Sequence, residues 1–386
     1  MANFDPKTSP KYLLLMEPEE RFPELFNSYV FLIMEILSLA KQLNRVFVLP
    51  PIHSEPRSAE LCEKGETDNY KIIMGKRIDP MESFFDISEI DKYIKIIPFN
   101  EFLKLCEKKL SCLCCFNNPH INTITSYNEK FTFNKSLKNK DVAELKDINE
   151  PFLGITGYQR GKYMIKTSLS WRYDPQMDYW EIRKHLIYRK EFIEKAEEFI
   201  HKKLEEKYLA VHWRGGDRCL AEVTKFQEEI IKDEKEMKKR LEYYLIKPIR
   251  KIMRRRNLKK VFLATNSGTK WHVEYLKSRL PIIIHPSSGR WENLQSESMI
   301  EQLICEKSDY YLSSPFNYKN CSSFSRWIID SRKLAGKGDD VSYMKKMGPV
   351  RHFQFLRDAL AKKIKPMLFF LYERLKKFAK NTKNKL

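Results

Sequence analysis

Short apolar runs that alternate with amphipathic segments constrain the fold of this chain most strongly. The run at 260–265 (KVFLAT) has the all-apolar centre of a parallel strand that is buried on both faces. Residues 27–43 repeat apolar side chains about every 3.6 positions, which predicts a helix. Because the alternation occurs in both halves, the sequence predicts an α/β protein with two Rossmann-like, doubly wound domains that face a cleft.

Residues 54–70 and 107–150 are polar and lack a clear period, so they are predicted to be loops or insertions. Further strands are expected at 12–16, 46–49, 93–98, 208–212, 282–285 and 310–312, and further helices at 179–207, 226–256, 271–279 and 296–307.

Size and charge limit the classes of partner. The chain has 386 residues, more than one ordinary domain, and its 42% hydrophobic content excludes an intrinsically disordered protein. The formal net charge of +20 favours a polyanionic or phosphorylated partner, such as nucleic acid, an acidic membrane surface or a nucleotide. Residues 361–386 hold nine Lys and Arg against Glu373, which is 9 − 1 = +8 of that charge. This tail is either a solvated segment or a contact for a membrane or nucleic acid.

The cysteines leave two interpretations open. Cys112 and Cys115 have a C-x-x-C spacing, with Cys106 and His120 nearby. A structural zinc site usually needs a second such pair, which is missing, so buried or reduced thiols are the favoured interpretation and zinc is the alternative. Eight cysteines in a chain of this length do not form a disulfide scaffold.

The expected strand at 208–212 ends in residues suited to phosphate. In doubly wound sheets, ligands bind beyond the carboxyl ends of the strands. Arg214 follows this strand, and a guanidinium is planar and always charged, which suits a bidentate phosphate contact. Gly215 and Gly216 permit a close approach of the backbone. The alternative is a tight turn in which Arg214 pairs with Asp217.

Three other segments follow strand ends. Asn266 comes after the strand at 260–265 and either hydrogen-bonds a base or sugar or forms an ordinary turn. Residues 322–325 (SSFS) open a helix, where hydroxyls and backbone N–H groups form an anion site or a plain serine cap. Glu24 lies before the first helix and either favours the helix dipole or acts as a general base.

Several common nucleotide and metal motifs are absent from the sequence. It contains no G-x-x-x-x-G-K-[ST], no G-x-G-x-x-G, no H-E-x-x-H and no Asp-x-Asp. Without an Asp-x-Asp, the usual means of holding a metal-bound diphosphate is missing. A bound diphosphate would therefore have to be neutralised by Arg214 and by backbone amides.

Several blocks between Tyr12 and Gly336 resemble motifs of the GDP-fucose protein O-fucosyltransferases, in the same order and at similar spacing. The type that modifies thrombospondin type 1 repeats is the closest likeness. The blocks are 23–27 (PELFN), similar to P-E-G-F-N; 48–51 (VLPP); 82–87 (ESFFDI), similar to S-E-F-F-D-L; 212–217 (HWRGGD), similar to H-L-R-R-K-D; 262–266 (FLATN), similar to F-V-A-T-D; and 301–305 (EQLIC) with 322–325 (SSFS), similar to D-Q-W-I-C…S-T-F-S.

The resemblance implies a GT-B fold and a metal-independent, inverting transfer without a cofactor. Fucose would pass from GDP-fucose to a Ser or Thr hydroxyl of a folded protein module such as a thrombospondin type 1 repeat. Glu24 would be the general base, and Arg214 would hold the β-phosphate and stabilise the departing GDP, since a fixed cation stabilises charge that develops on a leaving group. The implied donor-binding residues are Pro23, Leu25, Phe26, Asn27, His212, Trp213, Arg214, Asp217, Asn266, Ser322, Ser323, Phe324 and Ser325.

The resemblance also implies domains and a location. Residues 1–178 would form the acceptor-side domain with the base, 179–345 the GDP-fucose domain, and 346–386 a C-terminal helix with the basic tail. The implied location is the lumen of the endoplasmic reticulum. Because residues 1–10 show no signal peptide, a cytoplasmic location is the alternative. No transmembrane segment and no nucleic-acid partner are expected.

Departures from the family motifs keep two other functions open. Leu25 stands where the family has glycine, and Asn266 stands where it has aspartate. Gly215 and Gly216 replace an Arg-Lys pair. One alternative is therefore a GT-B glycosyltransferase with a different donor or acceptor. The other is a catalytically inactive relative that acts as a basic binding module.

Overall fold

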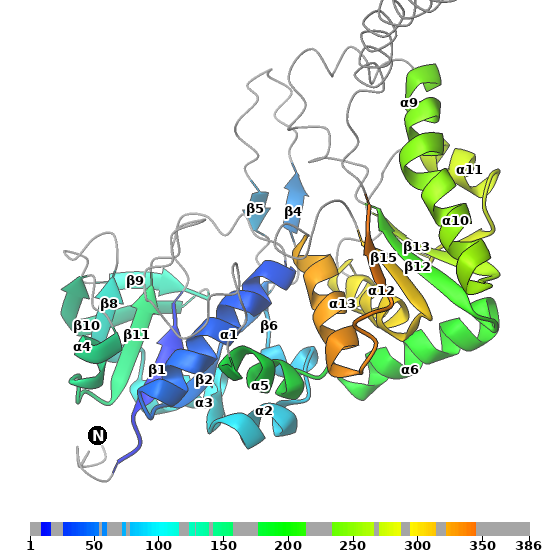
Figure 1. Ribbon diagram of the computed structural model, residues 1–386. Helices are drawn as coiled ribbons and strands as arrows, with labels where there is room; N and C mark the ends of the chain where they lie inside the picture. The colour runs from blue at the N-terminus through cyan, green and yellow to red at the C-terminus, as the bar shows by residue number, and fades with distance from the viewer. Residues whose placement is uncertain are drawn as a thin grey trace, which may run out of the picture. The chain divides into compact units, whose positions relative to one another are not determined.

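The computed structural model shows a chain whose described residues fall into two compact units (Figure 1). The larger unit takes its described residues from 1–212, 258–264 and 282–343. The smaller unit takes them from 213–257, 265–281 and residue 344. The structure describes residues 9–16, 26–53, 56–59, 72–74, 78–115, 123–127, 129–138, 142–156, 177–213, 234–265, 270–286, 294–313 and 322–344.

The larger unit contains a seven-stranded sheet with the strand order β7-β2-β1-β11-β8-β10-β9. Neighbouring strands run parallel, except for the antiparallel pair of β9 and β10. Two short antiparallel ladders also occur, β3 with β6 and β4 with β5. The strands are β1 Tyr12–Leu15, β2 Val46–Leu49, β3 Ile52–His53, β4 Pro56–Ala59, β5 Ile72–Met74, β6 Ile78–Asp79, β7 Ile96–Pro98, β8 Lys109–Cys115, β9 Thr123–Ser126, β10 Glu129–Lys138 and β11 Phe152–Thr156; the helices of this part are α1 Phe26–Gln42, η1 Met81–Ser83, α2 Ile87–Tyr93, α3 Phe99–Cys106 and α4 Val142–Lys146.

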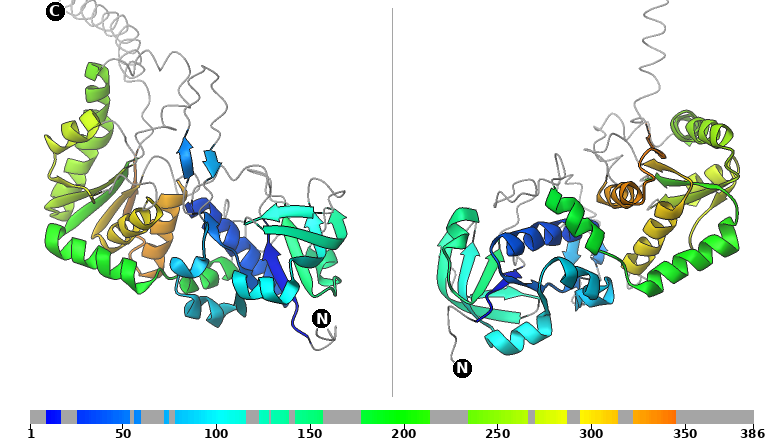
Figure 2. Two further views of the ribbon diagram at one scale, coloured as in Figure 1. Left: turned by 180° about the vertical axis from the view of Figure 1, so that it is seen from behind. Right: turned by 60° about the horizontal axis from the view of Figure 1, so that its bottom comes forward.

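Strand β1 shows why this sheet carries helices on both faces. Leu13 and Leu15 belong to the same buried cluster as α1, whereas Leu14 and Met16 belong to a cluster with α3. Because successive side chains of a strand point to opposite faces, α1 and α3 cover opposite faces of the sheet (Figure 2). Both faces of β1 are therefore covered by helices. This explains why the strand is a continuous apolar run, as the sequence predicted.

Residues 54–70 and 107–150 were predicted to be loops or insertions, and the loop interpretation was wrong where the structure describes them. Strand β4 lies in the first segment, and β8, β9 and β10 lie in the second. In β8 the side chains of Leu110, Cys112, Leu113 and Cys114 are buried, since cysteine behaves as a small apolar residue in a core. Strand β10 pairs with β8 on one side and β9 on the other, and much of its exposed surface is polar.

A second sheet has the strand order β14-β13-β12-β15-β16. Its pairs β12 with β15, β13 with β14, and β15 with β16 run parallel. Together with the first sheet it confirms the α/β class, while the domain boundaries predicted from the sequence stay predictions. The strands are β12 Tyr208–Trp213, β13 Lys260–Thr265, β14 Ile282–Ile283, β15 Tyr310–Ser313 and β16 Val341–Tyr343, and the helices in the larger unit are α5 Met177–His185, α6 Lys190–Phe199, η2 Ile200–Leu204, α12 Leu294–Lys307 and α13 Ser323–Leu334.

The prediction of a single helix at 179–207 is wrong, because α5 ends at His185 and α6 begins at Lys190. Between them Tyr188 forms an antiparallel bridge with Phe85. The flanking backbone groups are paired as well, because the N–H of Asp86 donates to the Ile187 carbonyl at 2.9 Å. No glycine or proline marks this break. A tertiary backbone pairing therefore overrides the local helical pattern.

The smaller unit contains most of the helix predicted at 226–256. Its described part runs without a break through α9 Glu234–Leu241, the π-helical turn η3 Glu242–Ile246 and α10 Lys247–Arg256. Asn257 ends α10 with a φ of 51°, a left-handed conformation that asparagine tolerates better than most residues. Arg250 donates to Glu242 at 3.2 Å and to the carbonyl of Arg279 at 3.2 Å, just after α11 Lys270–Lys277.

The buried thiols lead to a chemical prediction. Cys112 and Cys305 are free and buried, and burial is the main cause that raises the pKa of Cys112 to about 12 and that of Cys305 well above its usual value. Because the thiolate is the reactive form, N-ethylmaleimide should leave both residues unmodified in the folded protein at neutral pH. Peptide mass spectrometry checks this, with protein unfolded in guanidinium chloride as the control in which both react. Rapid labelling of either thiol in the folded protein would contradict their buried placement.

Candidate active site

The carboxyl end of β12 meets the N-terminus of α13. His212 on β12 lies 2.7 Å, through Nδ1, from the Oγ of Ser325, and its ring lies 4.5 Å from the ring of Phe324. His212 is 7% exposed and Ser325 is fully buried, so this contact is shielded from solvent. The structure therefore brings together two segments that the sequence predicted separately as binding residues.

Ser322 is the N-cap of α13. Its side chain accepts a hydrogen bond from the backbone N–H of Ser325 at 3.1 Å, and its backbone is extended with φ −63° and ψ 154°. This is the plain serine cap that the sequence left open as one of two alternatives. The cap accounts for the Ser322 hydroxyl, while the first-turn N–H groups of a helix have no intrahelical acceptor and can bind an anion.

A chain of hydroxyl groups leads to His212. Tyr311 on β15 is fully buried and donates its hydroxyl proton to the Oγ of Ser325 at 2.9 Å. In the tautomer of His212 that carries its proton on Nε2, the Ser325 hydroxyl can donate its own proton to Nδ1. In that tautomer Nε2 is a donor.

Phe26 and Trp213 have structural contacts of their own. Phe26 is 6% exposed and packs on Phe84 and Phe85 at ring distances of 5.6 and 6.1 Å. Trp213 ends β12 in the smaller unit, where its ring lies 5.9 Å from that of His272. Burial lowers the pKa of His272, which favours its neutral form. Both aromatic side chains are largely buried, so their contacts within the protein are enough to explain why these two positions are apolar.

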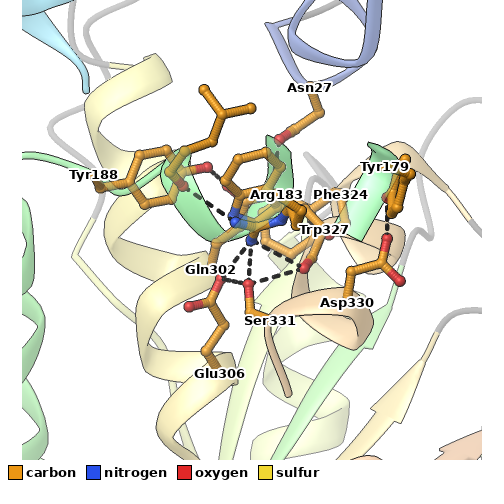
Figure 3. A network of polar contacts seen from close by, with 11 residues as sticks. Asn27, Tyr179, Arg183, Tyr188, Gln302, Glu306, Phe324, Trp327, Asp330 and Ser331 are labelled. Carbon is orange, nitrogen blue, oxygen red and sulfur yellow. Dashed lines mark hydrogen bonds and ion pairs between the residues drawn. The ribbon is translucent and has the colours of Figure 1, made fainter. Parts of the chain in front are cut away.

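Asn27 lies at the start of α1 and is 7% exposed. Its Oδ1 accepts a hydrogen bond from Nε2 of Gln302 on α12 at 2.8 Å (Figure 3). Gln302 also lies 3.4 Å from the carbonyl oxygen of Phe324, so α12 connects Asn27 with the first turn of α13. The Gln302 side chain thereby links Asn27 to the backbone of Phe324, the residue next to Ser325, which contacts His212.

Ser323 is the first residue of α13 and is half-buried. The other predicted site residues are not placed by the structure, so the catalytic assignments remain predictions from the sequence. Three residues of the site and its support were not predicted from the sequence, namely Gln302, Tyr188 and Tyr311, of which only Gln302 lies in a motif block. The predicted residues that fall outside the described ones are Pro23, Glu24, Leu25, Arg214, Asp217 and Asn266.

A layer of buried aromatic and charged side chains lies below this site (Figure 3). The Arg183 guanidinium lies 3.4 Å from the centre of the Trp327 ring, and it also donates to Ser331. Ser331 in turn donates to Glu306 at 2.7 Å. These contacts join α5 to α12 and α13 and hold the helix that presents Ser322 to Ser325.

Two findings concern metals and membranes. Within the described segments, no three His, Cys, Asp or Glu side chains come together in a way that could hold a metal ion. No helix in those same segments is long and apolar enough to span a membrane.

Comparison with known proteins identifies the family. The model of the family described as GDP-fucose protein O-fucosyltransferase matches residues 26–335. The chain belongs to this family. The assignment confirms the resemblance found in the sequence motifs and makes the chain a glycosyltransferase that uses GDP-fucose. The matched range begins just after the segment that contains Glu24.

Solved structures support the fold of this O-fucosyltransferase family member. The structure of POFUT1 in complex with GDP-fucose has 16% sequence identity and a TM-score of 0.57, and covers 88% of this chain and 99% of that one. POFUT1 in complex with GDP has 17% identity and a TM-score of 0.56, with 88% and 98% covered. Fucosyltransferase NodZ from Bradyrhizobium has 11% identity and a TM-score of 0.43, with 83% and 93% covered. The predicted GT-B type fold of the chain is thus confirmed. Comparison with curated proteins gives no match.

Proposed function

We propose that this O-fucosyltransferase family member transfers fucose from GDP-fucose to a Ser or Thr hydroxyl of a folded protein module. The reaction inverts the configuration at the sugar and needs no metal. The observation that carries this proposal is the contact of His212 with Ser325 and Phe324, which unites two predicted donor-binding segments. Family membership supplies the donor, and the acceptor and stereochemistry follow from the motif resemblance.

The donor diphosphate would lie at the N-terminus of α13. A helix N-terminus carries a partial positive charge and points backbone N–H groups at a bound anion. His212 adds a donor at Nε2 when its Nδ1 accepts from Ser325. Arg214 follows the end of β12 by one residue and would neutralise the β-phosphate.

In the proposed reaction, Glu24 accepts the proton of the acceptor hydroxyl. The hydroxyl oxygen then forms a bond to the anomeric carbon of fucose while the bond from that carbon to the GDP oxygen breaks. GDP leaves with the bonding electron pair, and Arg214 stabilises the charge that develops on it. Attack from the face opposite to GDP gives the inverted product.

Replacing Ser325 by alanine should weaken GDP binding about tenfold. The substitution removes a hydrogen-bond partner that His212 Nδ1 and the Tyr311 hydroxyl share, so the Nε2 donor of His212 is no longer held toward the diphosphate, and a hydrogen bond to a charged group is worth about 1.5–3 kcal/mol. Isothermal titration calorimetry with GDP measures the change. Ser278→Ala is the matched control, because among the described residues its hydroxyl donates to the nearby carbonyl of Tyr275 alone, at 2.8 Å. Unchanged GDP affinity in Ser325→Ala would contradict the role of His212 in donor binding.

Thermal unfolding with different nucleotides tests the proposed donor. Saturating GDP-fucose or GDP should raise the melting temperature, whereas UDP sugars should leave it unchanged. A rise with UDP sugars alone would show that the donor differs from the one proposed. The absence of any nucleotide response would contradict the transferase and favour an inactive relative that binds other molecules through its basic surface.

The acceptor and the location are further parts of the proposal. By resemblance, the acceptor is a thrombospondin type 1 repeat or a similar folded module, and the reaction takes place in the lumen of the endoplasmic reticulum. Protease protection of the tagged protein in microsomes tests the location. Digestion without detergent would favour the cytoplasmic alternative.

A further inference from the structure

Gln302 makes hydrogen bonds to three separate segments of the larger unit (Figure 3). Its Nε2 donates to Oδ1 of Asn27 at 2.8 Å and lies 3.4 Å from the carbonyl oxygen of Phe324. Its Oε1 accepts from the Tyr188 hydroxyl at 2.7 Å. Gln302 itself is fully buried, so none of these bonds competes with bulk water. It therefore connects the start of α1, the first turn of α13 and the break between α5 and α6.

The Phe324 carbonyl fixes the direction of the hydrogen bonds in this network. A carbonyl oxygen can only accept, so the Gln302 NH₂ group must face Phe324 and Asn27. The oxygen of the Gln302 amide then faces Tyr188, whose hydroxyl donates to it; burial raises the pKa of this phenol well above the usual value, so the hydroxyl keeps its proton. The tyrosine is itself held by rings, since Phe85 and Trp327 both lie 5.2 Å from it.

The orientation of the Gln302 amide determines that of Asn27. Because Oδ1 of Asn27 accepts from Gln302, the Nδ2 donors of the same amide face away from Gln302. The opposite orientation would place two NH₂ groups against each other in a buried site, which costs about 1–3 kcal/mol for the unmade bond. The amide of Asn27 is thus held in one of its two orientations by at least about a factor of five.

We propose that Gln302 is a positioning residue for fucose transfer, which holds the Asn27 amide with its NH₂ group toward the substrates. The inference rests on the proposed function. It goes beyond it by assigning a role to a buried residue that touches neither donor nor acceptor. The same side chain supports the carbonyl of Phe324, so Asn27 and the first turn of α13 are held relative to one another.

A set of four proteins tests the inference. Gln302→Met has a similar length but cannot form hydrogen bonds, and it should lower kcat for fucose transfer about tenfold while KM for GDP-fucose changes little. Asn27→Ala should lower kcat at least as much. In the double variant kcat should be no lower than in Asn27→Ala alone, because Gln302 acts through Asn27. Gln42→Met is the matched control, since Gln42 donates to Ser38 at 3.1 Å at the end of α1 opposite to Asn27, and its kcat should equal that of the wild type.

The conservative variant Gln302→Glu separates positioning from packing. A glutamate retains the size of glutamine and an acceptor for Tyr188, but it offers no NH₂ group to Asn27. Its kcat should therefore fall as far as that of Gln302→Met, whereas a residue that only fills space would retain activity.

Three results would overturn the inference. The first is a kcat in Gln302→Met within about twofold of wild type, and the second is full activity of Asn27→Ala. The third is a double variant whose loss is the product of the two single losses, because that would show independent action. A wild-type protein that neither binds GDP-fucose nor transfers fucose would instead overturn the proposed function, and this inference with it.

Discussion

Replacing Glu24 by alanine should abolish fucose transfer and leave the affinity for GDP-fucose unchanged. A general base contributes about 10²–10⁴-fold to a rate, and the acceptor hydroxyl is a poor nucleophile while it keeps its proton. The donor-binding groups proposed on β12 and α13 belong to other segments and stay intact in this variant. Calorimetry with GDP-fucose and transfer of labelled fucose measure the two properties in the same preparation.

Glu20→Ala is the matched control for this experiment, because Glu20 is a carboxylate in the same short segment of sequence. It should bind GDP-fucose and transfer fucose like the wild type. Full transfer activity in Glu24→Ala would rule out Glu24 as the base. Loss of GDP-fucose binding in Glu24→Ala would instead assign Glu24 to donor recognition.

Replacing Asp330 by alanine should lower the free energy of unfolding by about 3–5 kcal/mol. Asp330 is fully buried on α13, where it accepts a hydrogen bond from the Tyr179 hydroxyl and from Nε of Arg326 at 3.3 Å. Its removal leaves the buried Arg326 guanidinium without this carboxylate, and breaking a buried ion pair from one side is strongly destabilising. Urea denaturation monitored by circular dichroism measures the change in midpoint.

Two variants define what causes that loss. Asp91→Ala breaks an exposed ion pair with Lys95 at 3.5 Å, and it should change stability by less than about 1 kcal/mol. Tyr179→Phe removes only the hydroxyl, while its ring can still stack on Phe31, and it should cost less than Asp330→Ala. An Asp330→Ala protein as stable as the wild type would contradict the buried pairing.

Much of the fold could be predicted from the sequence because parallel strands that are buried on both faces appear as apolar runs. The strand expected at 260–265 is β13, and the one expected at 46–49 is β2. Strand β8 was missed because it lies in a segment that is polar and without a clear period as a whole, and its cysteines were interpreted only as buried or reduced thiols, with zinc as the alternative. Strand β10 was missed because its polar side chains interrupt any apolar run.

Long-range pairing explains the other errors. Nothing in the residues between α5 and α6 stops a helix, and the break depends on the bridge from Tyr188 to Phe85, which is about a hundred positions away in the sequence. Gln302 and Tyr311 were missed for a similar reason. Each lies inside a helix or strand, and only the folded chain shows which distant group its polar atoms contact.

The candidate site was predictable where a motif follows a strand or opens a helix. His212 and Ser325 were both named from the sequence, and they form a hydrogen bond of 2.7 Å in the structure. For residues 322–325 the sequence left open a plain serine cap or an anion site. The hydrogen bond from the Ser325 N–H to the Ser322 side chain shows that Ser322 is the N-cap of α13.

Transfer of labelled fucose from GDP-fucose to a panel of folded repeat domains is the decisive test of the proposed activity. We expect label to be incorporated at Ser or Thr of a folded module, GDP to be released in equal amount, and unfolding of the module to abolish transfer. Incorporation should persist in a metal chelator. Tight GDP-fucose binding without transfer to any folded module, or transfer that stops on metal removal, would show that the protein does not catalyse the proposed reaction.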